Sequence, residues 1–169
     1  MKVGPDAIAL IKHFEGCRLR AYPDPLTGGS PWTIGYGSTG QYVCEGITWS
    51  QQQADERLAN DLDLCESDLN NAISVPVTQR QFDAILSILY NVGHGSPIKD
   101  GIIRLRNQYS SSLLRKLNAR DLMGASAEFL KWISPGSSVE KALLKRRTAE
   151  QAVFNGVSAD DAIAIAEQT

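Results

Sequence analysis

The sequence predicts a mostly helical α+β fold, and three observations lead to this class. Prolines and glycines are concentrated between residues 17 and 47, which is typical of short antiparallel strands and hairpins. After residue 47, apolar residues recur mainly at helical spacing. The 169 residues are 43% hydrophobic and contain no apolar run near the ~20 residues that a membrane span needs. We therefore expect one globular domain with a small β region and no stable membrane insertion.

The first predicted helix covers residues 5–15. Pro5 and Asp6 suit the first turn of a helix, and Gly16 suits a left-handed stop after the last turn. Glu15 therefore lies at the C-terminal end of this helix. The turn-rich stretch that follows, about 16–47, is the predicted β region.

Two capping boxes mark the start of the next helices. Thr48 and Gln51 have the spacing of such a box and predict a long helix up to about residue 72. Thr78 and Gln81 repeat the pattern before a strongly apolar segment that predicts a buried helix, which ends at Gly93.

The last third of the chain is also helical. Ser137 with Glu140 predicts one helix start and Gly156 its end, while Ser158 predicts the start of a final amphipathic helix. The expected helices cover residues 111–118, 120–133, 138–156 and 159–168. All of these parts form a single predicted domain over residues 1–169, with a β lobe at about 16–47, a connecting helix at about 48–72, and a helical lobe at about 77–169 that includes helix 5–15.

Charge is unevenly distributed, although the net charge is only −2. Residues 99–147 hold 11 basic and 4 acidic side chains, a local net charge of +7. Such a segment either faces a polyanion or consists of solvated helix faces. We expect no nucleic-acid partner.

Two familiar motifs occur between Pro31 and Gly40, in "PWTIGYGSTG". Gly35, Gly37 and Gly40 match the GxGxxG turn of dinucleotide-binding proteins, but that turn needs a helix immediately after it, and none is expected before Thr48. The same stretch resembles a potassium-channel filter, which works only inside a membrane-spanning assembly. Neither motif is therefore functional here.

No metal or cofactor site is expected. His13 and His94 have no partners at metal-ligand spacing, and the three cysteines fit neither a CxxC pair nor a zinc ribbon.

Two carboxylates near the glycine-rich stretch have the qualities of an acid–base pair. Glu15 faces the negative end of a helix and lies beside Phe14, and both effects favour its protonated form, as a general acid requires. Asp24 lies in a polar turn, where it would stay ionised and activate a water molecule, with the Thr33 hydroxyl holding that water. Such a pair suits glycoside cleavage. The alternative is that Glu15 is a solvated surface residue and Asp24 a turn former.

The sequence resembles the phage-type lysozymes, the endolysins and muramidases of glycoside hydrolase family 24. The matching segments, in chain order, are "FEGCRLRAYPDP", "WTIGYG", "QFDAILSILYNVG", "LLRKLNARDLMGASAEFLKW" and "LLKRRTAEQAVF". The resemblance implies a two-lobed, lysozyme-like fold with a cleft between the lobes. It also implies cleavage of peptidoglycan at the β-1,4 bond between N-acetylmuramic acid and N-acetylglucosamine, for host cell lysis. We expect inversion at the sugar carbon, which an acid–base pair of carboxyl groups with room for a water molecule between them produces.

The resemblance assigns roles to the three candidate catalytic residues. Glu15 matches the proton donor of the family, Asp24 its second carboxylate and Thr33 its catalytic threonine. The hairpin between Asp24 and Thr33 is longer here than in the shortest members of the family. Thr27 and Ser30 are therefore alternatives for the third role.

The resemblance also implies residues that support catalysis. Arg147 matches an arginine that pairs with the catalytic glutamate, and Tyr90, Asn91 and Trp132 match positions that line the sugar cleft. Ordinary helix packing is the alternative for these last three residues.

Partners and location follow from the same resemblance. We expect a monomer that acts on peptidoglycan glycan strands. The stretch at residues 1–16 is a poor signal peptide, so we expect synthesis in the host cytoplasm and action at the cell wall after release. Either a membrane-permeabilising partner releases the protein, or the protein is delivered as part of a virion. The competing functions are a lytic transglycosylase, which gives anhydro products, and an inactive wall-binding module on the same fold.

Overall fold

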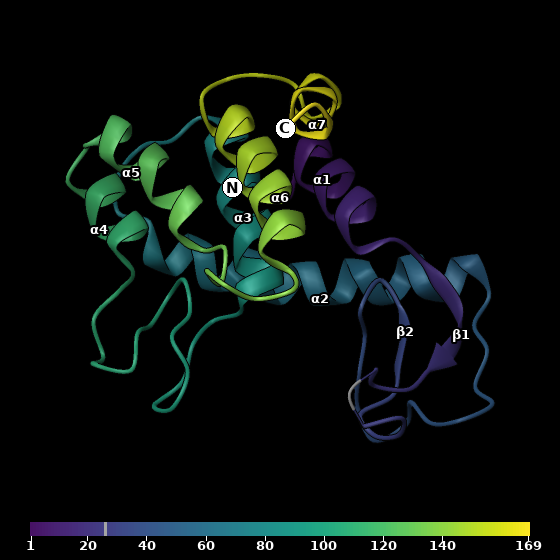
Figure 1. The fold of residues 1–169 in the computed structure, drawn as a ribbon. Helices are drawn as coiled ribbons and strands as arrows, with labels where there is room; N and C mark the ends of the chain where they lie inside the picture. The colour runs from purple at the N-terminus through teal and green to yellow at the C-terminus, as the bar shows by residue number, and fades with distance from the viewer. Residues whose placement is uncertain (26) are drawn as a thin grey trace. The chain divides into compact units, whose positions relative to one another are not determined.

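A computed structural model describes residues 1–25 and 27–169 (Figure 1). The chain divides into two compact units. Unit 1 contains Met1–Leu10 and Leu64–Thr169, and unit 2 contains Ile11–Asp63. The expectation of a single domain over the whole chain stays a prediction.

The elements confirm the predicted class, a mostly helical α+β fold with a small antiparallel sheet. None of the helices within the described residues combines the length and the apolar character that crossing a membrane requires. In chain order the elements are α1 (Pro5–Glu15), β1 (Arg18–Tyr22), β2 (Thr33–Gly35), α2 (Gln51–Ala72), α3 (Gln79–Val92), α4 (Ser112–Asn118), α5 (Leu122–Glu128), the 3₁₀ helix η1 (Phe129–Lys131), α6 (Glu140–Phe154) and α7 (Ala159–Glu167).

Unit 2 is built around a two-stranded sheet. Strands β1 and β2 are antiparallel, with Arg18 opposite Gly35 and Tyr22 opposite Thr33. Ile34 is fully buried beneath the sheet. Because successive side chains of a strand point to opposite faces, its neighbour Thr33 points away from this small core. The core itself consists of Ala21, Ile34 and Val43, with Trp32, Ile47 and Trp49 packed against it.

The start of α2 differs from the prediction. Thr48 forms an antiparallel bridge with Arg20, and this pairing holds Thr48 in extended backbone. The capping box therefore forms two residues later, where the Ser50 N–H donates to Gln53 Oε1 at 2.8 Å and the Gln53 N–H donates to Ser50 Oγ at 3.1 Å. The predicted box of Thr48 and Gln51 was wrong because sheet pairing competes with the cap.

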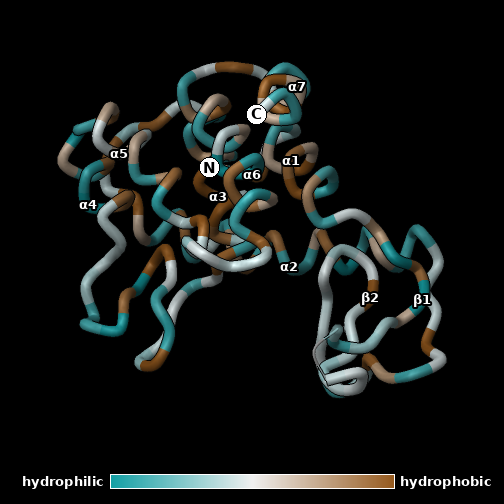
Figure 2. Tube along the Cα trace, in the orientation of Figure 1, coloured by the Kyte–Doolittle hydropathy of each residue, from teal (hydrophilic) through white to brown (hydrophobic). Residues whose placement is uncertain are grey.

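Unit 1 is built around α3, which is buried without interruption from Phe82 to Leu89. Its predicted capping box is confirmed, since Thr78 and Gln81 form both reciprocal hydrogen bonds, and its predicted end at Gly93 is confirmed as well. Figure 2 shows α3 as a largely hydrophobic segment, and in Figure 1 it lies beside α6.

One of the two caps predicted near the C-terminus is confirmed. Ser158 caps α7 by accepting from the N–H of Asp161. Helix α6 instead begins at Glu140 with no side-chain cap, and the Glu140 carboxylate accepts from the Gly136 N–H at 2.6 Å. The predicted cap at Ser137 was wrong because the Glu140 side chain bonds a turn that precedes the serine.

A buried carboxylate anchors the start of α1. Asp83 on α3 is fully buried and accepts hydrogen bonds from the Gly4 N–H at 2.9 Å and from Gln79 Nε2 at 2.8 Å. A Cβ at Gly4 would lie 2.2 Å from Asp83 Oδ2, so this contact requires glycine. Burial raises the pKa of Asp83, and the nearby Asp6 acts in the same direction.

This buried acid predicts a pH dependence of stability. The folded state binds a proton at Asp83 more readily than the unfolded chain does, so the contribution of Asp83 to stability falls as pH rises through its folded pKa. We expect the unfolding free energy of the wild type, relative to Asp83→Asn, to increase as pH is lowered from about 7 to about 4. Urea unfolding across this range measures the difference. The exposed Asp63→Asn serves as control. The prediction is contradicted if the unfolding free energy of the wild type minus that of Asp83→Asn decreases as the pH is lowered.

Candidate active site

Glu15 lies at the end of α1 in unit 2 and is half-buried. Its Oε2 atom lies 3.4 Å from the point that a Cβ at Gly37 would occupy. Gly37 has φ 93°, a left-handed conformation that favours glycine. Gly37, the second residue after β2, therefore has both the backbone and the space that let the Glu15 carboxylate lie against it.

Asp24 is held in a tight turn after β1. Its backbone N–H donates to the Gly29 carbonyl at 3.0 Å, and its own carbonyl accepts from the Gly28 N–H at 2.8 Å. Asp24 Oδ1 accepts from the Thr27 N–H at 3.0 Å. These bonds fix both the backbone and the carboxylate orientation of Asp24.

The hydroxyls near Asp24 differ in their surroundings. Thr27 Oγ1 donates to the Ser30 carbonyl at 3.1 Å and accepts from the Gly29 N–H at 3.3 Å. Ser30 is exposed, whereas Thr33 is half-buried on β2, on the face opposite the core. The Thr27 hydroxyl is thus engaged within its own turn, and Thr33 is the hydroxyl that a strand positions.

A hydrogen-bond network that sequence reasoning missed supports the last turns of α1. Lys12 Nζ donates to Asp55 Oδ1 at 2.7 Å, the Tyr36 hydroxyl donates to the same oxygen at 3.1 Å, and Gln51 Nε2 donates to the Tyr36 hydroxyl at 3.1 Å. The bond to Asp55 raises the pKa of Lys12, and Lys12 in turn lowers the pKa of Asp55. The network joins α1, the hairpin and α2 close to Glu15. It joins three segments that are distant in sequence, so no spacing pattern along the chain reveals it.

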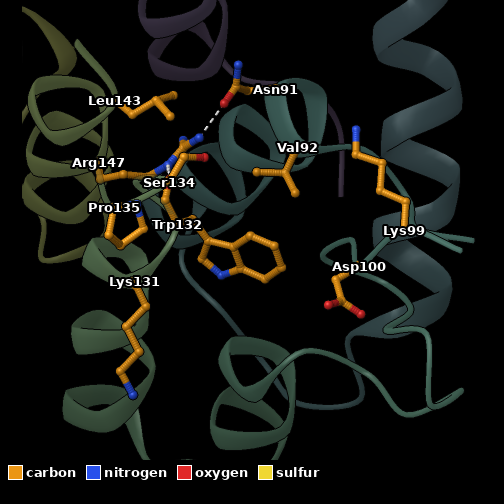
Figure 3. Close-up of a pocket in the computed structure, with 10 residues that line it drawn as sticks. All are labelled: Asn91, Val92, Lys99, Asp100, Lys131, Trp132, Ser134, Pro135, Leu143 and Arg147. Atoms are coloured by element: carbon orange, nitrogen blue, oxygen red, sulfur yellow. Dashed lines mark hydrogen bonds between the residues drawn. The ribbon is translucent and has the colours of Figure 1, made fainter. Parts of the chain in front are cut away.

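Unit 1 contains a pocket of about 480 Å³ (Figure 3). Three predicted residues line it: Asn91 at the end of α3, Trp132 after η1 and Arg147 on α6. Tyr90, which was predicted with them, is half-buried and is not among the lining residues. Its contact with substrate stays a prediction.

Arg147 organises one wall of this pocket. The guanidinium is fully buried, and its Nε donates to the Trp132 carbonyl at 3.0 Å. Its Nη2 donates to Asn91 Oδ1 and its Nη1 to Glu150 Oε2 (Figure 3 shows the bond to Asn91). One side chain thereby orients the amide of Asn91 and the backbone at Trp132. The expected pairing of Arg147 with Glu15 stays a prediction.

Glu150 balances two buried cations on α6. It is fully buried and also accepts from Arg146 Nε at 3.0 Å and from the Ser87 hydroxyl at 2.7 Å. Arg146 and Arg147 are 4% and 0% exposed, so the three charges form a buried triad. Buried charges need such pairing because desolvation strongly penalises a lone ion.

Metal binding finds no support in the part of the chain that the structure describes, where no three His, Cys, Asp or Glu side chains gather closely enough to hold an ion.

Known proteins resemble this chain over most of its length. The family described as phage lysozyme matches residues 12–150. The endolysin of Acyrthosiphon pisum secondary endosymbiont phage 1 is 37% identical over 158 residues, covering 91% of this chain and 98% of that protein. The endolysin of Bacillus phage PZA is 39% identical over 155 residues, covering 92% of this chain and 55% of that protein.

A solved structure agrees with these sequence relatives. A mutant of phage P22 lysozyme has a TM-score of 0.72 at 31% identity, covering 92% of this chain and 99% of that one. The resemblance predicted from sequence motifs is thus confirmed by whole-chain similarity in both sequence and fold. The chain belongs to the phage lysozyme family.

Proposed function

We propose that this lysozyme hydrolyses the β-1,4 bond between N-acetylmuramic acid and N-acetylglucosamine with inversion, using Glu15 as the general acid. Family membership confirms the predicted class, a peptidoglycan-degrading enzyme of the endolysin type. The bond, the stereochemistry and the residue roles are our proposal. The observation that supports it best is the Glu15 carboxylate against Gly37, on the hairpin whose strand β2 carries Thr33.

The mechanism divides the work between two carboxyl groups. Glu15 donates its proton to the glycosidic oxygen as the bond from that oxygen to the anomeric carbon breaks, and positive charge develops on the ring. Asp24 accepts a proton from a water molecule that attacks the anomeric carbon from the opposite face. The product is a reducing sugar with inverted configuration, and the Glu15 proton ends on the leaving sugar.

We assign the third role to Thr33. Its hydroxyl lies on strand β2 and faces away from the core, whereas the Thr27 hydroxyl already donates and accepts within its turn. A hydroxyl on a strand has a more fixed position than a hydroxyl on an exposed turn, such as that of Ser30. The Thr33 hydroxyl can therefore hold the attacking water in a better-defined orientation.

This assignment predicts an order among alanine variants. Thr33→Ala is expected to lower kcat on purified peptidoglycan by about 10²-fold, because the attacking water loses its orientation. Ser30→Ala, the matched control in the same hairpin, is expected to keep nearly full kcat. Turnover of labelled peptidoglycan gives both values, and the reverse order would transfer the role to Ser30.

Substrate binding in unit 1 involves Asn91 and Trp132, which line the pocket of Figure 3. An aromatic face suits the C–H face of a pyranose, and an amide suits its hydroxyl edges.

The glycan strands of peptidoglycan are part of the cell wall, so the protein acts there. Monomeric state, synthesis in the host cytoplasm and a membrane-permeabilising partner stay predictions.

Product analysis tests the proposed reaction. Digestion of purified peptidoglycan is expected to release fragments with reducing N-acetylmuramic acid ends, whose first anomer seen by proton NMR is α. Anhydro ends in mass spectrometry would instead establish a lytic transglycosylase. Protein that pellets with peptidoglycan without releasing fragments would establish a wall-binding module.

A further inference from the structure

The connection between α3 and α4, residues 93–111, forms one side of the pocket in unit 1. We call it the pocket loop. Ile102 anchors the loop in the core, since its side chain is fully buried, its N–H donates to the Gly93 carbonyl at 3.0 Å and its carbonyl accepts from the Ser111 N–H at 3.3 Å. The loop is therefore tied to the ends of both neighbouring helices.

Two glycines let the backbone of the pocket loop cross itself at close range. A Cβ at Gly95 would lie 1.8 Å from the Arg104 carbonyl oxygen, and a Cβ at Gly101 would lie 2.2 Å from the Gly95 nitrogen. The Gly101 N–H donates to the same Arg104 carbonyl at 2.9 Å. Any larger residue at either position would push apart the two backbone segments that meet here, one at Gly95 and the other at residues 101–104. The crossing fixes the residue before Gly101, which is Asp100.

Arg106 orients the carboxylate of Asp100. The Arg106 N–H donates to Oδ1 at 2.8 Å, and its guanidinium Nε donates to Oδ2 at 3.2 Å. These bonds lower the pKa of Asp100, so this side chain is ionised and accepts hydrogen bonds. Each carboxylate oxygen has further lone pairs for a ligand, because a carboxylate offers about four acceptor sites.

Asp100 faces the aromatic wall of the pocket. The Asp100 and Trp132 side chains both line the pocket, and Figure 3 shows the indole of Trp132 extending in the direction of Asp100, while the Lys99 and Lys131 side chains extend away from the indole. Lys131 Nζ donates to Glu128 at 2.8 Å, outside the lining of the pocket. The pocket thus combines an apolar face with one acceptor carboxylate.

We propose that Asp100 is a substrate-binding residue that accepts hydrogen bonds from a sugar ring of the glycan, packed against Trp132. A hydroxyl or acetamido N–H on the edge of a pyranose supplies the donor, and its C–H face packs on the indole. The ammonium of a diamino acid in the peptide stem offers the same donor chemistry, but Arg106, already bonded to Asp100, opposes a second cation there. This inference rests on the proposed function, because it takes the glycan as ligand.

Binding measured without cleavage tests the inference. In a Glu15→Gln background, calorimetry with N-acetylglucosamine tetramer is expected to show that Asp100→Asn raises Kd roughly tenfold, the size of one hydrogen bond to a charged group. Asp63→Asn, an exposed acid outside the pocket lining, is the matched control and is expected to leave Kd unchanged. With Glu15 present, Asp100→Asn is expected to raise KM for peptidoglycan about as much, with kcat retained.

A second variant separates ligand contact from loop structure. Gly101→Ala opens the crossing, so it is expected to weaken tetramer binding like Asp100→Asn, and the double variant is expected to add little further loss. Thermal unfolding confirms that each variant is folded. An unchanged Kd in folded Asp100→Asn overturns the inference, as does selective loss of binding to the free stem tetrapeptide. If the wild type failed to cleave peptidoglycan while Asp100→Asn still weakened tetramer binding, the inference would stand and the proposed reaction would fall.

Discussion

Glu15→Gln is expected to lower the turnover of purified peptidoglycan by roughly three orders of magnitude, because the amide has no proton to give to the leaving oxygen. The substitution keeps the size and shape of the side chain, so its contact with Gly37 is retained. KM is expected to change little, since the lost proton transfer belongs to the transition state rather than to ground-state binding. Release of soluble fragments from labelled peptidoglycan measures the loss.

Glu45→Gln is the matched control for this experiment. Glu45 is an exposed glutamate of the same unit, and the same chemical change there is expected to leave turnover intact. Circular dichroism verifies that both variants fold like the wild type. If Glu15→Gln retained a tenth or more of the wild-type turnover, another group would be the acid and the proposed mechanism would be wrong.

Glu150→Gln is expected to reduce the free energy of unfolding by about 3–5 kcal/mol, the usual result of leaving a buried charge without its partner. The neutral amide no longer balances Arg146 and Arg147, which are 4% and 0% exposed. The displaced guanidinium of Arg147 would also release its bonds to Asn91 and to the Trp132 carbonyl, so substrate binding is expected to weaken as well. Urea unfolding measures the first effect and calorimetry with the glycan the second.

A glutamate on the surface of α2 provides the comparison. Glu56 is exposed, and its carboxylate accepts a hydrogen bond from Gln52 Nε2. Glu56→Gln is therefore expected to change the free energy of unfolding by less than about 0.5 kcal/mol. Equal losses for Glu150→Gln and Glu56→Gln would show that the buried triad contributes nothing special to stability.

Local sequence signals predicted the elements where no distant contact competed with them. Thr78 and Gln81 form the expected box, and within residues 1–25 and 27–169 no β-bridge is formed by Thr78 that would compete with the cap. Thr48 has an equally good signal, but its bridge to Arg20 moves the cap to Ser50, and that pairing depends on how the hairpin folds back. Spacing along the chain contains no information on such a partner.

The charges of the candidate site were harder to predict. The segment at residues 99–147 was expected to face a polyanion or to consist of solvated helix faces. Many of its cationic side chains instead form ion pairs with carboxylates of the same chain. Those in ion pairs are Arg106, Lys116, Lys131, Lys145, Arg146 and Arg147. Arg146 and Glu150 are four residues apart on α6, and this spacing usually indicates an exposed pair, so their burial could not be predicted from it. Local surroundings made Glu15 and Asp24 candidates for an acid–base pair, but only the family resemblance favoured them over the alternatives, because carboxylates at helix ends and in turns are common.

The buried triad on α6 has a consequence for engineering. Replacing all three charged side chains by apolar residues of similar volume often raises the stability of a protein, since no desolvation cost remains. Even if such a core melted at a higher temperature here, it would have lost the guanidinium that orients Asn91 and the backbone at Trp132. Directed evolution that selects only for survival of heating would therefore enrich thermostable proteins that bind the glycan weakly. A screen for lytic activity has to accompany the thermal screen.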